Sequence, residues 1–308
     1  MNGRHLFPTI LIFGVLAAVL FCGCAEVTEM GSQIAQDAGV ISAEQAGSLT
    51  RSAQVIEKTQ QELTPEQEYY IGRAVVAEVL QTYPPLDRPQ ANTYLNLLGQ
   101  SLAIFSNRPE TFGGYHFLLL DSDEVNAFAA PGGLILVTRG MLFCCANEDE
   151  LAAVLAHEIC HVEMKHGLRA IKQGRLTEAL MVVATESAKQ LGSEELASLT
   201  RDFEASVGDV VMTLTTSGYS RTQERDADAA AVQLLRRAGY PGAAMITMLQ
   251  RMDERLADAR GLGFAKTHPS AKSRADALRT VITDAKSAPD TVRQERFSAA
   301  MRSMPAGR

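Results

Sequence analysis

Hydrophobic and polar positions in the first half of the chain predict two helices followed by two strands. The first helix begins at Thr64-Pro65-Glu66-Gln67, where the threonine can cap the first turn, the proline fits that turn and the glutamine completes a capping box. The helical pattern continues to about Gln81, and a second helix fits Arg88 to Ala103. Short apolar runs then predict strands from Tyr115 to Leu120 and, after a Pro-Gly-Gly turn, from Leu134 to Thr138.

From Asn147 onward the pattern is helical almost to the end, with breaks at glycine and proline residues. We expect one mostly helical domain over residues 64–284 with a small β-sheet, an α+β arrangement. Residues 24–63 are polar and interrupted by glycines, which is typical of a tether, with one possible amphipathic helix. Residues 285–308 are polar and contain two prolines, which predicts a flexible tail.

The first residues predict an export signal. A positively charged start precedes an apolar run from Leu6 to Phe21, which is shorter than the roughly 20 residues that span a bilayer. The run ends in Leu-Phe-Cys-Gly-Cys, which resembles a bacterial lipoprotein box with cleavage before Cys24. We expect a signal peptide over residues 1–23 and a lipid anchor on Cys24 at the periplasmic face of the outer membrane, because Ala25 does not resemble an inner-membrane retention signal. A soluble secreted or periplasmic protein, a short uncleaved anchor and inner-membrane anchoring are the alternatives.

Composition and charge indicate a globular protein that does not bind nucleic acid. Hydrophobic residues make up 46% of the 308 residues, which is enough for a buried core. The net charge is −7, and the chain contains no long basic block. Because a nucleic-acid partner requires clustered lysine and arginine, we expect none.

The strongest chemical signal is an H-E-x-x-H pattern formed by His157, Glu158 and His161. A helix start at Asn147 and an apolar run place the pattern inside a helix, which Gly167 would end. Two histidines four residues apart lie about 40° apart on one helix face, so both can bind one zinc ion. Glu158 is turned enough to act as a general base rather than as a ligand. A chance match on a buried helix is the alternative.

A zinc peptidase needs a third protein ligand. In a continuous helix His166, nine residues after His157, would point about 180° away, so we expect it behind the ligands or at the helix end. Glu224 and Asp228 share one face of an alanine-rich helix predicted from Thr222 to Ala238, which is thin enough to pack closely on the motif helix. Glu224 would then complete the site while Asp228 orients a ligand histidine. A solvated acidic stripe paired with neighbouring arginines is the alternative.

Several short motifs in a fixed order strengthen this interpretation. They are Asn126-Ala127-Phe128, Pro131-Gly132-Gly133, Thr138-Arg139-Gly140, Glu150-Leu151 with residues 154–158, His161-Val162 with His166, Ser220-Arg221 with Glu224 and Ala227-Asp228, Ala238-Gly239-Tyr240-Pro241, and Thr267-His268-Pro269 with Arg274. Together they resemble the M48 family of zinc metallopeptidases, which includes Ste24-type and HtpX-type proteases. The likeness covers about Thr64 to Leu278. The likeness is greater to the periplasmic lipoprotein branch of the family than to its multispanning members, because no membrane-spanning pattern follows the signal.

The resemblance implies a zincin-like peptidase domain with one Zn²⁺ per chain. It implies His157, His161 and Glu224 as ligands and Glu158 as catalytic base. His268 and Arg274 are further candidates, which could place an imidazole and a guanidinium over the open zinc position. There they would stabilise the oxyanion, or His268 would be a reversible fourth ligand that closes the site. A turn in which both make only structural hydrogen bonds is the alternative.

Two segments invite a functional interpretation. The strand Leu134–Val137 is either a sheet edge that pairs with an extended substrate or a plain core strand. Residues 171–219 form a long excursion between the two halves of the predicted site, either a lid or additional helical packing.

The predicted reaction is peptide-bond hydrolysis in misfolded or misassembled cell-envelope proteins, with the envelope assembly machinery as a possible partner. One rival is a chaperone-like or scaffolding lipoprotein whose zinc site is kept closed by His268; retention of Glu158 disfavours it. The other is a domain with purely structural zinc, which we would expect to recruit cysteine, although Cys160 points away from the histidine face.

Overall fold

The computed structural model describes residues 33, 36, 42, 63–170, 193–258, 268, 270–282 and 290–304. The predicted signal peptide, Cys24 and most of the predicted tether lie outside these residues, as does the stretch 171–192 of the long excursion. By its contacts the chain divides into two compact units, Met1–Leu63 with Lys172–Phe203, and Thr64–Ile171 with Glu204–Arg308. The second unit contains every residue of the site described below.

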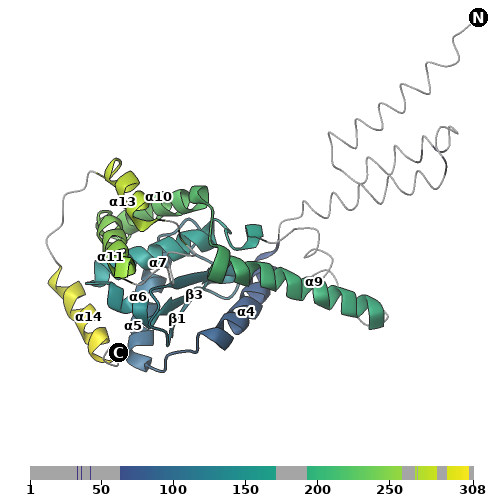
Figure 1. Ribbon diagram of the computed structural model, residues 1–308, viewed down its shortest axis with the longest axis horizontal. Coiled ribbons are helices and arrows are strands. Elements are labelled where there is room, and N and C mark those ends of the chain that lie inside the picture. The colour runs from purple at the N-terminus through teal and green to yellow at the C-terminus, as the bar shows by residue number, and fades with distance from the viewer. Residues whose placement is uncertain are drawn as a thin grey trace, which may run out of the picture. The chain divides into compact units, whose positions relative to one another are not determined.

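The elements follow one another as shown in Figure 1. In chain order they are α4 (Pro65–Thr82), α5 (Pro89–Ala103), β1 (His116–Leu120), β2 (Ala127–Ala130), the 3₁₀ turn η1 (Pro131–Gly133), β3 (Leu134–Thr138), α6 (Arg139–Cys144), α7 (Glu148–Glu163), the 3₁₀ turn η2 (Leu168–Ala170), α9 (Ser193–Met212), the π-helical turn η4 (Thr213–Ser217), α10 (Arg221–Arg237), α11 (Ala244–Asp258), α13 (Ala271–Arg279) and α14 (Thr291–Arg302). The mostly helical α+β fold with a small sheet is confirmed. In the part of the chain that the structure describes, no helix is both long enough and apolar enough to cross a membrane.

Helix starts follow local capping chemistry. The Gln67 amide donates to Thr64 Oγ1 at 3.2 Å while Gln67 Oε1 accepts from the Thr64 amide at 2.9 Å, so the predicted capping box of α4 is present. The Asn147 side chain likewise accepts from the Glu150 amide at 2.9 Å and begins α7 at the predicted position. These starts need only residues three apart, which is why the sequence pattern finds them.

Within the described residues the sheet has three strands in the order β1-β3-β2, with β1 parallel and β2 antiparallel to β3. The hypothesis that Leu134–Val137 is an edge for substrate pairing is therefore wrong, because β3 is the central strand and both of its sides are paired. The sequence analysis also missed β2, whose Ala-Phe-Ala-Ala sequence is short and carries no alternation, since all four of its residues are buried.

The outer edge of β1 is covered by side chains of α5 and, at its end, by the backbone of Pro85 and Leu86. Asn92 Oδ1 accepts from the Leu119 amide at 2.9 Å. Asn96 accepts from the Phe117 amide at 2.9 Å and donates to the Phe117 carbonyl at 2.5 Å. Asparagines one helical turn apart thus match strand residues two apart, and they take the place of a further strand.

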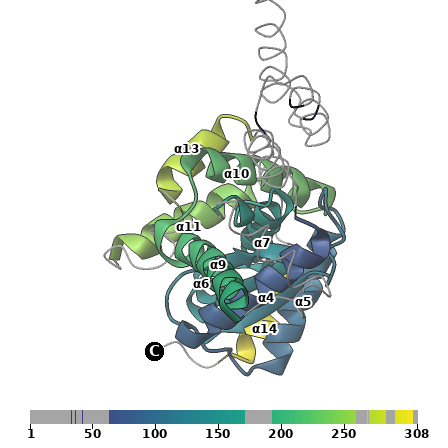
Figure 2. The ribbon, with the colours of Figure 1, turned by 90° about the vertical axis from the view of Figure 1, so that its right-hand side faces the viewer.

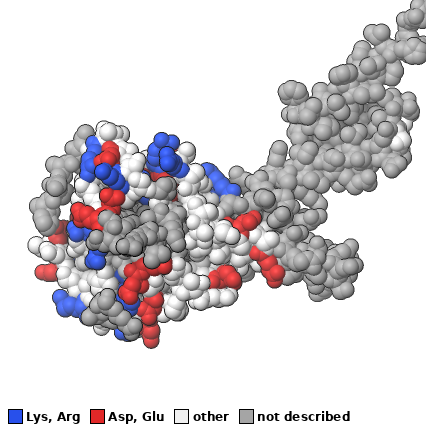
Figure 3. All heavy atoms as spheres, in the orientation of Figure 1, with Lys and Arg blue, Asp and Glu red and all other residues white. Residues whose placement is uncertain are grey.

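Helix α7 lies in the middle of the second unit. It packs against α10, α11 and α5, which are labelled around it in Figures 1 and 2, and against β2. Helix α4 packs on η1, where a side chain at Gly72 would place its Cβ 1.9 Å from the Pro131 carbonyl oxygen. On the face seen in Figure 3, basic and acidic side chains are interspersed among uncharged ones, in keeping with the modest net charge.

The expected flexible tail is wrong for residues 291–302, which form α14. Asp290 caps this helix, Phe297 and Ala300 are buried, and the helix packs on α5 and α7. The sequence pattern missed it because only a few apolar residues are needed, while arginines make the remaining contacts: Arg293 with Asp149 at 3.0 Å and Arg296 with Glu148.

Candidate metal centre

The two histidines of the H-E-x-x-H pattern lie side by side on α7. Their Nε2 atoms are 3.0 Å apart, and each side chain is only 1% exposed. The four-residue spacing inside an α-helix produces this pairing. Buried nitrogen atoms this close to one another require a shared proton or a shared cation, so the pair alone already suggests a binding site.

Helix α10 brings Glu224 to the pair. Ser220 caps this helix through the Gln223 amide, and Glu224 follows in the first turn. Its Oε1 lies 3.4 Å from His161 Nε2 and its Oε2 lies 3.6 Å from His157 Nε2. The fully buried Ala227 and Ala231 on the same helix allow α10 to pack closely on α7, as the alanine-rich sequence suggested.

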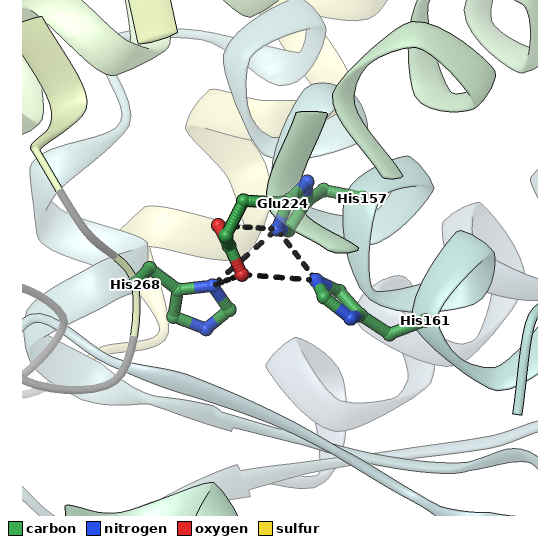
Figure 4. A group of neighbouring side chains, drawn as sticks. All are labelled: His157, His161, Glu224 and His268. Atoms are coloured by element: carbon green, nitrogen blue, oxygen red, sulfur yellow. Dashed lines mark hydrogen bonds and ion pairs between the residues drawn. The ribbon is translucent and has the colours of Figure 1, made fainter. Parts of the chain in front are cut away.

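His268 joins the same cluster from the segment before α13 (Figure 4). Its Nδ1 is 2.8 Å from Glu224 Oε1 and 3.4 Å from His157 Nε2. One ligand atom from each of the four residues falls within a group no more than 4.8 Å across. Tetrahedral zinc, with bonds of about 2.0–2.1 Å, separates neighbouring ligand atoms by roughly 3.3 Å, which these contacts bracket. The donor set and the spacing therefore fit a metal ion.

Behind this cluster lie Asp228 and Arg274. Asp228 Oδ1 is 3.0 Å from His157 Nδ1, which is the contact that a carboxylate orienting a ligand histidine would make. Arg274 donates to Asp228 at 2.6 and 2.8 Å and lies 2.8 Å from Glu224 Oε2. Burial alone would raise the pKa of Asp228, but the Arg274 guanidinium and His157 outweigh burial and lower it to about 2.

These contacts argue against the expected role of Arg274 at a reacting oxygen. The guanidinium is shared between the carboxylates of Asp228 and Glu224, which suits it to hold the two acids in place. Burial would raise the pKa of Glu224, but His268 and Arg274 keep that pKa well below its usual range. Glu224 is therefore a carboxylate, the form that binds a cation.

Glu158 differs from Glu224 although both are buried. It is 0% exposed, and within the described part of the chain neither of its carboxylate oxygens has a hydrogen-bond partner. Burial raises its pKa, and His268 and His157 offset this only in part. A carboxylate that is close to the cluster and uses neither oxygen structurally has the properties of a general base.

Two further side chains contact His161: His166, which we expected behind the ligands or at the helix end, and Tyr219, which the sequence did not single out. His166 lies with Nδ1 2.9 Å from His161 Nδ1, because α7 ends at Glu163 and the chain turns back instead of continuing to Gly167. Tyr219 stacks on the His161 ring with centroids 4.1 Å apart and planes 17° apart. The only sequence signal for Tyr219 is its place directly before the Ser220 cap. Cys24 lies outside the described residues, and Cys160 is a buried free thiol that is not part of the cluster.

Comparison with known proteins gives the family. The family model for peptidase family M48 matches residues 89–282. The "Beta-barrel assembly-enhancing protease" of Escherichia coli K12 is 32% identical over 216 residues, which cover 68% of this chain and 42% of that protein. The "Mitochondrial metalloendopeptidase OMA1" of Schizosaccharomyces pombe is 33% identical over 48% of this chain and 41% of its own length. The E. coli "Metalloprotease LoiP" is 27% identical over 61% of this chain and 67% of its own length.

The chain spans less than half the length of the beta-barrel assembly-enhancing proteases that it matches. The matched region nevertheless contains the whole cluster, from His157 to His268, together with Arg274. With a family match over more than half of its residues, the chain belongs to peptidase family M48.

Proposed function

We propose that this protein is a zinc-dependent endopeptidase. The observation that carries the proposal is the buried His157/His161/Glu224 cluster with the carboxylate of Glu158 next to it, which has no hydrogen-bond partner among the described residues. Two imidazoles and one carboxylate are a common set of ligands for catalytic zinc, which keeps one position open. A purely structural zinc site would have no use for a buried base, and the neighbouring Cys160 does not contribute a thiolate.

The chemistry divides between the ion and the chain. Bound at this cluster, zinc would polarise the scissile carbonyl and lower the pKa of a water molecule to about 7. Glu158 takes the proton from the attacking water and delivers it to the leaving amine. Asp228 holds His157 in the tautomer that leaves Nε2 free, and Arg274 keeps the carboxylates of Asp228 and Glu224 ionised and in place.

His268 decides when the site is open. Its Nδ1 already lies among the other three ligand atoms, and all four side chains are at most 2% exposed. We therefore favour a reversible fourth ligand over oxyanion stabilisation. The second candidate function, a chaperone-like or scaffolding lipoprotein with a latent site, draws support from this same closed arrangement.

Substrate and location rest on the sequence and the relatives. The name of the E. coli K12 relative refers to β-barrel assembly, and the residues up to Cys24 resemble a lipoprotein box. Misfolded or misassembled envelope proteins are the proposed substrates, at the periplasmic face of the outer membrane and with the assembly machinery as a possible partner.

The test is digestion of an unfolded protein by the zinc-loaded full chain, with Glu158→Gln as the comparison. Loss of the base should slow cleavage by about 10²- to 10⁴-fold while zinc remains bound, because Glu158 is not a ligand. Zinc content is measured in parallel by elemental analysis. A zinc-bound wild type that cleaves no faster than Glu158→Gln would rule out the peptidase and favour the binding protein.

A further inference from the structure

We propose that His166 and Tyr219 position the metal ligand His161, one at the edge of its ring and the other on its face. His157 has a carboxylate, Asp228, to orient it, whereas no carboxylate of the described residues pairs with Nδ1 of His161. The proposal rests on the proposed metal site and adds two positioning residues to it. We call His166 and Tyr219 the His161 clamp.

The edge contact sets the tautomer of His161. Its Nε2 faces the cluster, 3.0 Å from His157 Nε2 and 3.4 Å from Glu224 Oε1. A neutral imidazole that binds a metal through Nε2 carries its proton on Nδ1, and ligand histidines usually donate that proton to a fixed acceptor. The Nδ1 of His166, at 2.9 Å, is in the place of that acceptor.

An unusual turn after α7 places His166 next to His161. After α7 ends, Lys165 adopts a left-handed conformation with φ of 54°, which is uncommon for a residue other than glycine. The His166 amide then donates to the His161 carbonyl at 3.0 Å. The Lys165 ammonium lies 2.8 Å from Glu68, a buried carboxylate on α4. This turn is therefore held from another helix, and its result is the contact between His166 and His161.

The face contact comes from Tyr219, whose ring also lies 5.8 Å from that of His166, centroid to centroid. Tyr219 follows the π-helical turn η4 and Gly218 (φ of 69°) and precedes the Ser220 cap of α10, so its backbone is fixed at both ends. Tyr219 is 7% exposed, and its ring stacks on His161. The hydroxyl is buried and has no hydrogen-bond partner within the described residues. It is therefore the ring, and not a hydrogen bond of the hydroxyl, that restrains His161.

The clamp predicts different outcomes for matched pairs of variants. His166→Ala removes the acceptor and should weaken metal binding about 10- to 100-fold, whereas His166→Asn keeps an acceptor oxygen near the Nδ1 position and should stay close to wild type. Tyr219→Leu removes the stacked ring and should weaken binding roughly tenfold, whereas Tyr219→Phe keeps the ring and should bind as wild type does.

The experiment titrates the metal-free full chain with Zn²⁺ against a chromophoric chelator and records the visible spectrum of the Co²⁺ form, which reports ligand geometry. His116→Ala and Tyr115→Leu are controls, since neither residue is part of the metal cluster. Circular dichroism of the metal-free variants checks folding, and the conservative Asn and Phe variants test the proposal even if Ala or Leu unfolds the chain.

Weaker binding and an altered Co²⁺ spectrum in His166→Ala and Tyr219→Leu, restored in His166→Asn and Tyr219→Phe, support the clamp. Wild-type affinity in His166→Ala or Tyr219→Leu overturns it, as does an Asn or Phe variant as weak as its Ala or Leu counterpart. If the wild type binds no metal, both the clamp and the proposed function are wrong. If it binds metal normally but cleaves no protein, only the proposed peptidase function is wrong.

Discussion

At the scale of single residues, two glutamates with the same side chain acquire opposite properties. Both Glu158 and Glu224 are buried, and burial raises the pKa of each. In Glu224 the charges of His268 and Arg274 more than cancel this effect, while in Glu158 the opposing charges do so only in part. The environment thus separates a permanent carboxylate, suited to bind a cation, from one suited to exchange protons.

For His268, the direction in which replacement changes the cleavage rate distinguishes the two proposed roles. If the closed form makes up about 90% of the molecules, removing the closing imidazole in His268→Ala should raise the cleavage rate roughly tenfold. The measurement is the initial rate on an unfolded protein at saturating zinc, with His116→Ala as control. A rate that falls in His268→Ala would instead give the imidazole a part in the chemistry.

At the scale of elements, side chains of α5 form hydrogen bonds with β1 that the backbone of a neighbouring strand would normally form. Asn92 and Asn96 pair with the edge of β1 as another strand would, and Asn96 forms two such hydrogen bonds with Phe117. Because Phe117 is 3% exposed, water cannot readily replace a lost partner. The helix α5 and the sheet are therefore joined by polar as well as apolar contacts.

Asn96→Ala should lower the free energy of unfolding by about 2–3 kcal/mol, since it leaves a buried amide and a buried carbonyl of Phe117 unpaired. Urea denaturation followed by circular dichroism measures this loss. Gln100→Ala, which removes one longer bond of 3.2 Å to the Tyr115 carbonyl, is the matched control and should cost less. Equal losses in the two variants would contradict the strand-like role of Asn96.

The first turn of α7 is a second point where elements are joined. Its three consecutive acids each bind an arginine from another helix: Glu148 with Arg296, Asp149 with Arg293 and Glu150 with Arg251. Glu148 also accepts from the hydroxyls of Tyr94 and Tyr240 at 3.1 and 2.9 Å. Acids at a helix start are favoured by the helix dipole, so these pairs anchor α14 and α11 to the helix that carries His157 and His161.

Arg296→Leu should detach α14 in part, because Glu148 would lose its only cationic partner among the described residues. We expect a loss of about 1–2 kcal/mol in the free energy of unfolding and faster proteolytic removal of α14. Limited proteolysis with mass spectrometry measures the second effect. Arg302→Leu, on the exposed end of the same helix, is the control; cleavage at the same rate in both variants would show that the ion pair does not hold α14.

At the scale of the whole molecule, the metal cluster joins parts of the chain that are far apart in sequence. His157 and His268 are separated by 111 residues, and Glu224 comes from a third segment. An ion bound to all of them would connect α7, α10 and the segment before α13. Metal binding at this cluster would therefore stabilise the folded protein.

Removing the metal should lower the melting temperature. At a free zinc concentration of about 100 times the Kd, the bound ion contributes roughly 2.7 kcal/mol to stability, which chelation removes and added zinc restores. Differential scanning calorimetry of the full chain with chelator, and then with excess zinc, measures the shift. His157→Ala should show no zinc-dependent shift, and a wild type whose melting temperature ignores zinc would contradict the proposed cluster.

The sequence by itself determined the features that depend on residues close together in the chain. The caps at Thr64 and Asn147, the pairing of His157 with His161 on one helix face and the strand Leu134–Thr138 all follow from spacings of two to four residues. Ordered family motifs extended this reach to Glu224, which the structure places beside both histidines.

Only the tertiary structure decided how these pieces meet. In the structure β3 is the central strand of the sheet, and α14 packs on α7. His166 and Tyr219 both contact the His161 ring. Arg274 pairs with the carboxylates of Asp228 and Glu224. Each of these contacts joins segments that no local pattern relates, or depends on where a helix ends, as at Glu163. The physical reason is that these contacts are stabilised by burial and by charge pairing between segments that are distant in the sequence. A local sequence pattern does not show which distant segments will meet.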